Sequence, residues 1–318
     1  MTIVTRRRDL LTAGLAIGVS GLAPFLMPRM AFGQTSPVPT TIRHAQGETT
    51  LPDAVNKVLC FDMASLDTLD ALGVPVAGVP TGVKPAHLAK YDGPVHVRIG
   101  TLFEPDYEAV NAAQPDLIIV GGRSAPKYAD LSAIAPTIDL TVKTDRFIDN
   151  ALDCADTLGR IFGKSAEVKA RADRLRASVA EVKAAAAGAG RGLLILTTGG
   201  KISAYGPGSR FGVLHTEYGV APAAERLDAA NHGQAVNFEF ILQTNPDWLF
   251  VIDRDSAIGR EGQSARQLLD NDLVRRTIAW TKGRVVYLNA SNWYLIGGGL
   301  AAMQQDADDI KAALTGKA

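Results

Sequence analysis

Short apolar runs alternate with segments of helical periodicity along most of the chain. In the first half, five runs rich in β-branched residues have the length of buried strands, at residues 58–61, 76–79, 97–99, 117–120 and 137–140. After the first run, residues 65–72 place three leucines on one helical face, with Ser65 as a candidate cap and Gly73 as the stop. Strands that alternate with helices in this way predict an α/β lobe.

A second set of strands and helices occupies the C-terminal part of the sequence. Its strands are predicted at residues 193–197, 202–205, 248–252 and 285–288. A helix is expected over residues 210–220, RFGVLHTEYGV, which ends in Gly-Val as the first predicted helix does. The chain is therefore expected to form two related α/β lobes, over residues 49–150 and 191–318.

A charged helical segment lies between the two lobes. In residues 165–187 the apolar positions step by four and three, at Val168, Ala172, Leu175, Val179, Val182 and Ala186. A helix of this length spans roughly 33 Å at 1.5 Å per residue, about the diameter of a domain. Three heptads of mostly Ala and Val would make a weak coiled coil. The segment is therefore expected to be a rigid strut within a helical linker over residues 151–190.

The first residues have the pattern of an export signal. Residues 1–33 combine a basic start, an apolar middle rich in Gly and Ala, and a small-residue cleavage site that ends at Gly33. Arg7 and Arg8, followed by two leucines, favour the twin-arginine export route, whereas Asp9 leaves ordinary secretion open. Two prolines interrupt the apolar run before it is long enough to span a membrane.

The charge balance limits the classes of partner. The chain has 33 basic and 33 acidic residues, and removal of residues 1–33 would leave 29 and 32. This balance gives no reason to expect nucleic-acid binding. Cys60 and Cys154 do not follow the export signal as a lipid-attachment cysteine would, and their pairing stays open. We expect a freely diffusing periplasmic protein with a flexible lead-in over residues 34–48.

One sequence pattern occurs twice. The copies are YEAVNAAQPDLIIVGGR at 107–123 and FEFILQTNPDWLFVIDR at 238–254. Glu108 and Glu239 are 131 positions apart, and so are Arg123 and Arg254. A helix that precedes a parallel strand begins near the carboxyl edge of the sheet, where α/β folds bind ligands. An acid in a first helical turn is also favoured by the helix dipole, and an arginine is a common surface charge, but the repetition favours a shared cleft.

Three more segments carry candidate binding residues. GGKISAYGPGSRFG is a glycine-rich loop with Arg210 at the start of a predicted helix, suited to an anion. NHGQAVN carries His232 among small and polar residues, and NASNWYLIGGGL places Trp293 and Tyr294 between a strand and three glycines. The structural alternatives are a phosphate loop, a solvent-exposed histidine and aromatic packing. Nucleotide binding is poorly supported, because no GxGxxG follows a strand and no GxxxxGK[ST] occurs.

An enzyme would need a nucleophile with its base, or paired acids in a pocket. The five histidines are scattered without the HExxH spacing of a metalloprotease, and a zinc-binding protein would offer several His or acidic ligands to one ion. The remaining candidates are three arginines, one histidine and one tyrosine. This set suits a large anionic ligand that already holds most of a metal's coordination shell.

Four segments resemble a known family: KVLCFDMASLDTLDALGVPVAGVP, GGKISAYGPGSRFGVLH, NHGQAVNFEFIL and VVYLNASNWYL. They are similar to periplasmic binding proteins of ferric-siderophore ABC importers, and in particular to the subgroup for catecholate siderophores of the enterobactin and petrobactin kind. The similarity covers about residues 50–315. The resemblance implies the class III fold, an α/β architecture of two Rossmann-like lobes joined by one long helix, which closes little on binding. A monomer is expected.

The resemblance also implies roles for individual residues. It implies a ligand pocket lined by Arg123, Arg210 and Arg254, and Trp293 is a further ligand-binding candidate from its own segment. It implies that His232 and Tyr294 complete the coordination shell of ferric iron when the siderophore supplies only four donor atoms. It implies contacts with basic residues of the membrane permease for Glu108 and Glu239.

The expected function is capture of a ferric catecholate-type siderophore and its delivery to an ABC importer permease for iron uptake, without a permanent cofactor and without catalysis. Ferric iron favours catecholate, phenolate and imidazole donors, and guanidinium groups match such oxygen-rich anions. The alternatives are another cargo on the same scaffold, namely a hydroxamate siderophore, haem or cobalamin, or a two-lobed α/β enzyme. The three arginines argue against a neutral cargo.

Overall fold

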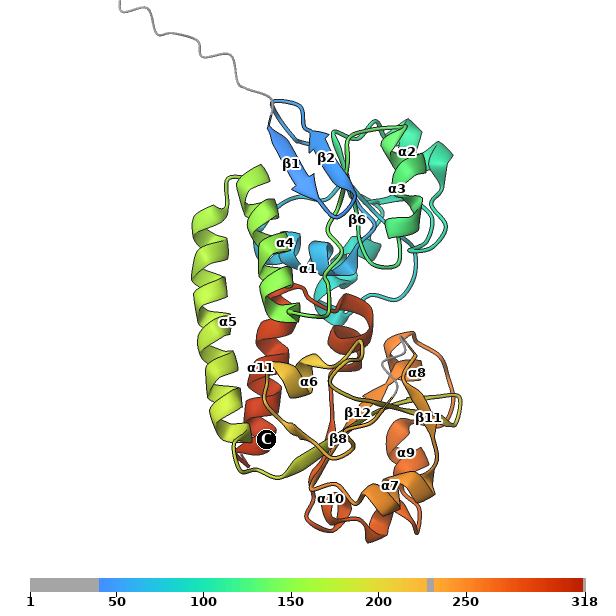
Figure 1. Ribbon diagram of the computed structural model, residues 1–318. Helices are drawn as coiled ribbons and strands as arrows, with labels where there is room; N and C mark the ends of the chain where they lie inside the picture. The colour runs from blue at the N-terminus through green and yellow to red at the C-terminus, as the bar shows by residue number, and fades with distance from the viewer. Residues whose placement is uncertain (1–39, 228–231, 317–318) are drawn as a thin grey trace, which may run out of the picture. The chain divides into compact units, whose positions relative to one another are not determined.

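The computed structural model describes residues 40–227 and 232–316 (Figure 1). The predicted export signal over residues 1–33 lies outside these residues, as does the first part of the predicted lead-in. In the two described ranges, no helix combines the length and apolar character needed to cross a membrane. The first element of the described chain is strand β1 (Thr41–His44).

A β-hairpin precedes the first lobe. Strand β1 pairs antiparallel with β2 (Gly47–Thr50), and Gly47 has a φ of 132°, a conformation that glycine adopts readily. The hydroxyl of Thr49 donates a hydrogen bond to the carbonyl of Thr137 over 2.7 Å, which fixes the hairpin to the lobe. Residues 41–48 were expected to belong to a flexible lead-in. They form this hairpin instead, because their Thr and Ile residues favour strands and the pairing satisfies their backbone.

The N-terminal lobe contains a parallel five-stranded sheet with the order β5-β4-β3-β6-β7. Its strands are β3 (Val58–Cys60), β4 (Gly78–Val79), β5 (Val97–Arg98), β6 (Leu117–Val120) and β7 (Thr137–Asp139). Its helices are α1 (Met63–Ala71), η1 (Ala86–Asp92), α2 (Tyr107–Ala113), η2 (Ala125–Lys127), α3 (Tyr128–Ser132) and α4 (Phe147–Ile161). A strand is present in each segment where the sequence predicts one.

Helix α1 begins earlier than the sequence pattern indicates. Its cap is Asp62, whose carboxylate accepts hydrogen bonds from the backbone N (2.8 Å) and the hydroxyl (2.7 Å) of Ser65. Ser65, the expected cap, is therefore the partner of the cap. Because Asp62 follows β3 closely, it brings a carboxylate to the carboxyl edge of the sheet.

The C-terminal lobe contains a mixed sheet with the order β11-β9-β8-β12-β13, in which β10 also pairs with β8. Its strands are β8 (Arg191–Thr198), β9 (Lys201–Tyr205), β10 (Ala221–Pro222), β11 (Gln234–Val236), β12 (Trp248–Asp253) and β13 (Val285–Tyr287). Its short helices are α6 (Val213–Thr216), α7 (Phe238–Thr244), α8 (Arg254–Ala257), α9 (Ala265–Leu269), η3 (Val274–Arg276) and α10 (Ile278–Thr281). The helix predicted over residues 210–220 is reduced to α6, and Gly219, at a φ of 79°, lies in the turn beyond it.

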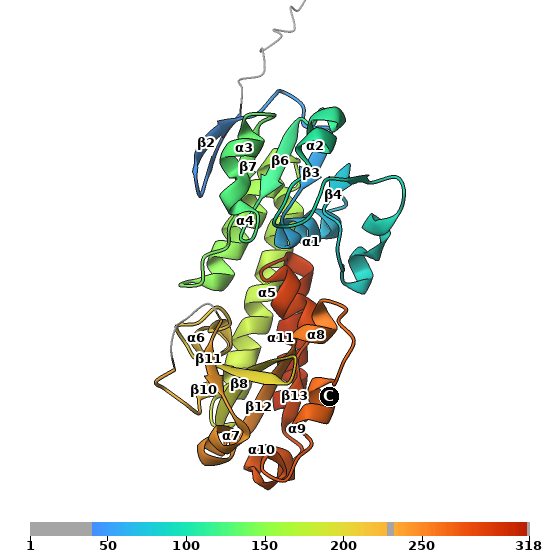
Figure 2. The same ribbon diagram turned by 90° about the vertical axis from the view of Figure 1, so that its right-hand side faces the viewer.

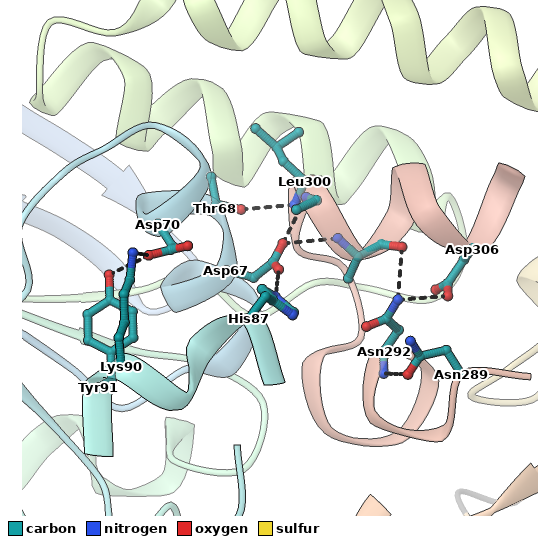
Figure 3. Close-up of polar contacts among 12 residues, drawn as sticks. Asp67, Thr68, Asp70, His87, Lys90, Tyr91, Asn289, Asn292, Leu300 and Asp306 are labelled. Carbon is teal, nitrogen blue, oxygen red and sulfur yellow. Dashed lines mark hydrogen bonds and ion pairs between the residues drawn. The ribbon is translucent and has the colours of Figure 1, made fainter. Parts of the chain in front are cut away.

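Two long helices lie side by side. The predicted strut is α5 (Ser165–Ala186), and it packs against α4 and against the C-terminal helix α11 (Leu300–Leu314), as both views show (Figures 1 and 2). The first turn of α11 is held by α1, because the carboxylate of Asp67 accepts hydrogen bonds from the backbone N of Ala301 (2.8 Å) and Ala302 (3.2 Å) (Figure 3). These contacts connect the last helix of the chain to the N-terminal lobe.

The apolar core runs through both lobes. Alternate residues of β3 and β6 face opposite sides of the first sheet, and alternate residues of β12 do the same in the second. On one side of each sheet these residues join the buried residues of α1, α4, α5 and α11 in one continuous cluster. The lobes therefore share a core along the long helices.

The sequence repeat is also a structural repeat. Helices α2 and α7 start 131 positions apart and have the same length, and β6 and β12 follow at the same offset. The helices are capped by Asp106 and Asn237, whose side chains each accept a backbone N–H. They end at Gln114 and Asn245, both in the left-handed conformation with φ of 48° and 42°. The two copies thus agree in caps, helix and strand.

Candidate ligand-binding site

A cavity of about 520 Å³ lies where residues of both lobes meet. The N-terminal lobe contributes Arg123 and a set of apolar side chains, and the C-terminal lobe contributes Arg210, His232, Trp293 and Tyr294. The volume is in the range of ordinary small-molecule pockets. The structure therefore gathers at one cavity most of the binding residues that the sequence predicts.

Tyr294 lies at the centre of the charged part of the cavity. It belongs to a π-helix, η4 (Ser291–Ile296), a rare element that often occurs at functional sites. Arg254 donates a hydrogen bond from Nε to the phenolic oxygen over 2.7 Å, and its guanidinium carbon is 5.2 Å from the centre of the ring. A second bond, from Nη1 of Arg254 to the hydroxyl of Thr198 (3.1 Å), fixes the guanidinium.

These contacts change the acidity of the phenol. Burial by itself raises the pKa of Tyr294, but the hydrogen bond from Arg254 and the charges of Arg254, Arg123 and Arg210 outweigh burial. The pKa of Tyr294 is therefore lowered from its usual value. A lowered pKa makes the phenolate form of this side chain easier to reach.

Arg123 and Arg210 also contact Tyr294, and their guanidinium carbons lie 5.4 and 4.9 Å from the centre of its ring. Nη2 of Arg123 and Nη2 of Arg210 donate to the carbonyl of Tyr294 over 2.6 and 2.7 Å, and Nη1 of Arg123 donates to the carbonyl of Leu295 (3.1 Å). Burial and the nearby charge of Arg123 lower the pKa of Arg210. The two guanidinium groups thus stabilise the π-helix and line the cavity at the same time.

The positions of the arginines differ in part from the sequence-based expectation. Arg123 follows β6 and Arg254 follows β12, both at the carboxyl ends of their strands, as the repeat predicts. Arg210 lies in a turn before α6 rather than in a helix. Arg254 does not line the cavity and reaches it through the phenol of Tyr294.

His232 and Trp293 occupy different environments at the cavity. His232 is exposed in the turn just before β11, where its imidazole is accessible. Trp293 is only 5% exposed and packs against the rings of Phe211 and Tyr218, with centroid distances of 6.3 and 6.4 Å. Trp293 therefore supports the cavity wall, which was the structural alternative for this residue, and also lines the cavity.

Glu108 and Glu239 lie outside the cavity. They occupy the first turns of α2 and α7, and both are exposed. This placement fits a contact with a protein partner and equally fits a favourable interaction with the helix dipole.

Two carboxyl groups at the cavity, the half-buried Asp62 and the buried Asp306, were not predicted as site residues. Asp62 lies beneath the loop that carries Arg123, where a Cβ at Gly121 would be 2.8 Å from its Cγ. Asp306 of α11 accepts a hydrogen bond from Nδ2 of Asn292 (3.2 Å) (Figure 3). Burial raises the pKa of both carboxyl groups. The cap position after a strand could have indicated Asp62, whereas nothing in the local sequence marks Asp306.

A site for a bare metal ion is not formed in the described part of the chain, where no three His, Cys, Asp or Glu side chains gather as ligands. Cys60 and Cys154 are both free thiols, and burial raises the pKa of each. They hydrogen-bond to the carbonyls of Asp62 and Leu140 respectively. The cysteines therefore act as core residues in this structure.

Comparison with known proteins decides the family. Residues 58–291 match the family model described as periplasmic binding protein. The chain belongs to the periplasmic binding protein family. Members of this family bind substrates for transport, and the predicted fold class, two α/β lobes joined by a long helix of the class III type, is confirmed.

Several members of the periplasmic binding protein family are similar over most of their length. The chain is 43% identical over 279 residues to the petrobactin-binding protein YclQ of Bacillus subtilis (strain 168), covering 86% of this chain and 88% of YclQ. The crystal structure of YclQ superposes with a TM-score of 0.84 at 42% identity, covering 87% of this chain and 99% of the other.

Two proteins of Vibrio species are also similar. The ferric-anguibactin-binding protein FatB of Vibrio anguillarum is 32% identical over 278 residues, 86% of each chain. The crystal structure of the periplasmic catecholate-siderophore binding protein VctP of Vibrio cholerae superposes with a TM-score of 0.82 at 31% identity, covering 86% of this chain and 100% of VctP.

Proposed function

We propose that this periplasmic binding protein captures a ferric siderophore in the cavity and delivers it to the permease of an ABC importer. The observation that carries the proposal is the phenol of Tyr294, which Arg254 holds at the cavity with a lowered pKa. Phenolate oxygen is a donor that ferric iron favours. The similar proteins are named for binding petrobactin, ferric anguibactin and a catecholate siderophore, and these names support a ferric siderophore as the ligand here.

The charges at the cavity support an anionic complex as the cargo. Arg123 and Arg210 line the cavity, and Arg254 stands directly behind the phenol. A ferric catecholate complex carries net negative charge and presents a dense set of oxygen atoms, which planar guanidinium groups recognise. We therefore favour a catecholate-type siderophore over a neutral hydroxamate complex, haem or cobalamin.

His232 and Tyr294 would complete the iron's coordination shell for some ligands. Both line the same cavity, and His232 is exposed in a loop. A siderophore with four donor atoms leaves two positions on ferric iron, which one imidazole and one phenolate can fill. A siderophore with six donor atoms leaves none, so the pair would then act only as part of the cavity wall.

The proposal also covers the protein's location, its domain organisation and its contact with the permease. We propose an exported, monomeric protein of the periplasm, with a signal over residues 1–33, lobes over 49–150 and 191–318 and a helical linker over 151–190. Glu108 and Glu239 would contact basic residues of the permease. The protein would hold no permanent cofactor and catalyse no reaction, because its task is to bind and release a ferric complex.

A binding assay with a spectroscopic readout tests the proposal. Ferric complexes of catecholate, hydroxamate and hydroxycarboxylate chelators, and separately haem and cobalamin, are titrated into the mature protein. Tryptophan fluorescence is recorded, since Trp293 lies beside Tyr294 at the cavity. We expect saturable quenching by ferric catecholates. For a chelator with four donor atoms, we also expect a tyrosinate-to-iron absorption band that Tyr294→Phe removes. Quenching by haem or cobalamin alone would favour those cargoes instead.

A further inference from the structure

Phe103 is an exposed aromatic side chain at the edge of the cavity. It is 59% exposed, and it lines the cavity together with its neighbour Leu102. An apolar ring of this size in contact with water forgoes the stabilisation that burial would give. A ligand that covers the ring would recover this free energy.

The loop that carries Phe103 is held by its own hydrogen bonds. The hydroxyl of Thr101 accepts the backbone N–H of Phe103 (3.2 Å) and of Glu104 (2.9 Å), and the backbone N of Thr101 donates to the carbonyl of Glu104 (2.8 Å). Gly100 has a φ of 95°, and a Cβ there would lie 2.4 Å from backbone atoms. The loop is thus a tight turn that glycine permits, and it presents Phe103 in a defined place.

Two neighbouring segments fix the same loop. The backbone N and the hydroxyl of Thr81 both donate to the carbonyl of Gly100, over 2.7 and 2.9 Å. On the other side, Nζ of Lys127 pairs with the carboxylate of Glu104 over 3.1 Å. Because the loop is anchored at both ends, a ligand would meet Phe103 without first ordering its backbone.

The cavity also differs in chemistry from one region to another. The phenol of Tyr294 and the guanidinium groups of Arg123 and Arg210 form its charged region. The N-terminal lobe adds a set of apolar side chains, Phe61, Leu102, Phe103, Val142 and Phe147. This combination suits a ligand with an anionic metal centre and a flat apolar group.

We propose that Phe103 determines specificity by stacking on an aromatic ring of the ligand. This inference rests on the proposed function and adds to it a residue that would distinguish the aryl rings of a catecholate complex from aliphatic hydroxycarboxylates and hydroxamates. Aromatic pairs gain free energy beyond the area they bury, in offset or edge-to-face geometry. Loss of the ring should weaken binding of an aryl chelate about two- to tenfold.

The test compares Phe103→Leu with the wild-type mature protein, because leucine keeps an apolar side chain but has no ring. The probes are ferric dihydroxybenzoate, ferric citrate and a ferric trihydroxamate, titrated by fluorescence quenching. We expect a two- to tenfold weaker affinity of Phe103→Leu for the dihydroxybenzoate complex. Affinities for any citrate or trihydroxamate complex that binds should stay unchanged.

The matched control is Val95→Ala, which alters a side chain that is 82% exposed and does not line the cavity. It should leave every affinity unchanged, and thermal unfolding should confirm that both variants fold. An equal loss for aryl and aliphatic complexes, or no loss for any, would overturn the role of Phe103 while leaving the proposed function in place. If the wild-type protein binds no ferric complex, the proposed function fails and the inference falls with it.

Discussion

Arg254 and Tyr294 are joined by a hydrogen bond of 2.7 Å from Nε to the phenolic oxygen. The arginine comes from the first residue of α8 and the tyrosine from the π-helix, 40 positions further along the chain. Of these two residues, only Tyr294 lines the cavity. Arg254 acts on the phenol, and the phenol faces the cavity.

The first prediction concerns the titration of this phenol. In Arg254→Gln the phenolate loses its charged donor, so the pKa of Tyr294 should rise. We would measure the tyrosinate absorbance against pH and subtract the curve of the matching Tyr294→Phe protein to isolate this one group. Arg43→Gln, on the surface of the hairpin, is the control and should leave the titration unchanged. A Tyr294 midpoint unaffected by Arg254→Gln would contradict the assigned hydrogen bond.

The second prediction concerns the arginines as ligand-binding groups. Replacing Arg123 or Arg210 by Ala should weaken binding of a ferric catecholate about tenfold or more, because a charge-assisted contact is lost. The effect should shrink at high salt, where charges are screened. Affinity is measured by fluorescence quenching at two salt concentrations, with Arg43→Ala as the control. Unchanged affinity in both variants would show that these arginines serve only to hold the carbonyls of the π-helix.

The third prediction concerns the two glutamates of the repeat. Glu108→Ala combined with Glu239→Ala should leave affinity for the ferric siderophore intact and strongly reduce uptake through the partner importer. Single surface ion pairs contribute under about 1 kcal/mol, so each single variant should have a mild effect. Uptake of labelled iron by cells with the variant proteins is the measurement. Normal uptake by the double variant would leave the glutamates as helix-dipole partners, and a loss of affinity would place them in the pocket.

The fourth prediction concerns the link between α1 and α11. Asp67 is fully buried and, besides the first turn of α11, accepts a hydrogen bond from Nε2 of His87 (2.7 Å) (Figure 3). A hydrogen bond to a charged group contributes about 1.5–3 kcal/mol, and Asn cannot accept all the hydrogen bonds that the carboxylate accepts. Asp67→Asn should therefore lower the free energy of unfolding by a few kcal/mol, whereas Asp53→Asn, at an exposed site, should not. Chemical denaturation measures both.

The same link has a pH dependence with a defined sign. The hydrogen bond to Asp67 raises the pKa of His87 above its usual 6.5, burial opposes this rise, and the charges of Asp67, Asp70 and Lys90 also act on the imidazole. The stability that His87 contributes is thus fully present below about pH 6.5 and is lost as the pH rises through its folded-state pKa. The difference in stability between wild type and His87→Gln should be largest in acid and shrink in mildly alkaline buffer. A stability difference between wild type and His87→Gln that does not change with pH would contradict this contribution of His87.

The sequence predicts the parts of the site that depend on local pattern. The repeat places Arg123 and Arg254 at strand ends because a Pro-Asp turn, an apolar run and an arginine follow one another in the chain, and the structure has both there. The strut helix is also found, since its apolar stripe is a property of one segment. These features need no knowledge of distant contacts.

The features that the sequence does not predict depend on contacts between distant segments. The π-helix around Tyr294 is held by Arg123 and Arg210, which are far from it in the chain. Asp306 lines the cavity only because α11 returns along α5. The hairpin at residues 41–50 is stabilised by hydrogen bonds to β7. Local propensity carries no information about such partners.

The structural repeat gives the binding site a direction. Arg123 and Arg254 occupy equivalent places in the two copies, yet one bonds to the backbone of Tyr294 and the other to its phenol. Two similar walls alone would accept a symmetric chelate in either of two orientations. Under the proposed function, Tyr294 would remove this equivalence, because only one end of the ligand could meet its phenolate. The duplicated scaffold would thereby become a polar receptor that selects one pose of its cargo.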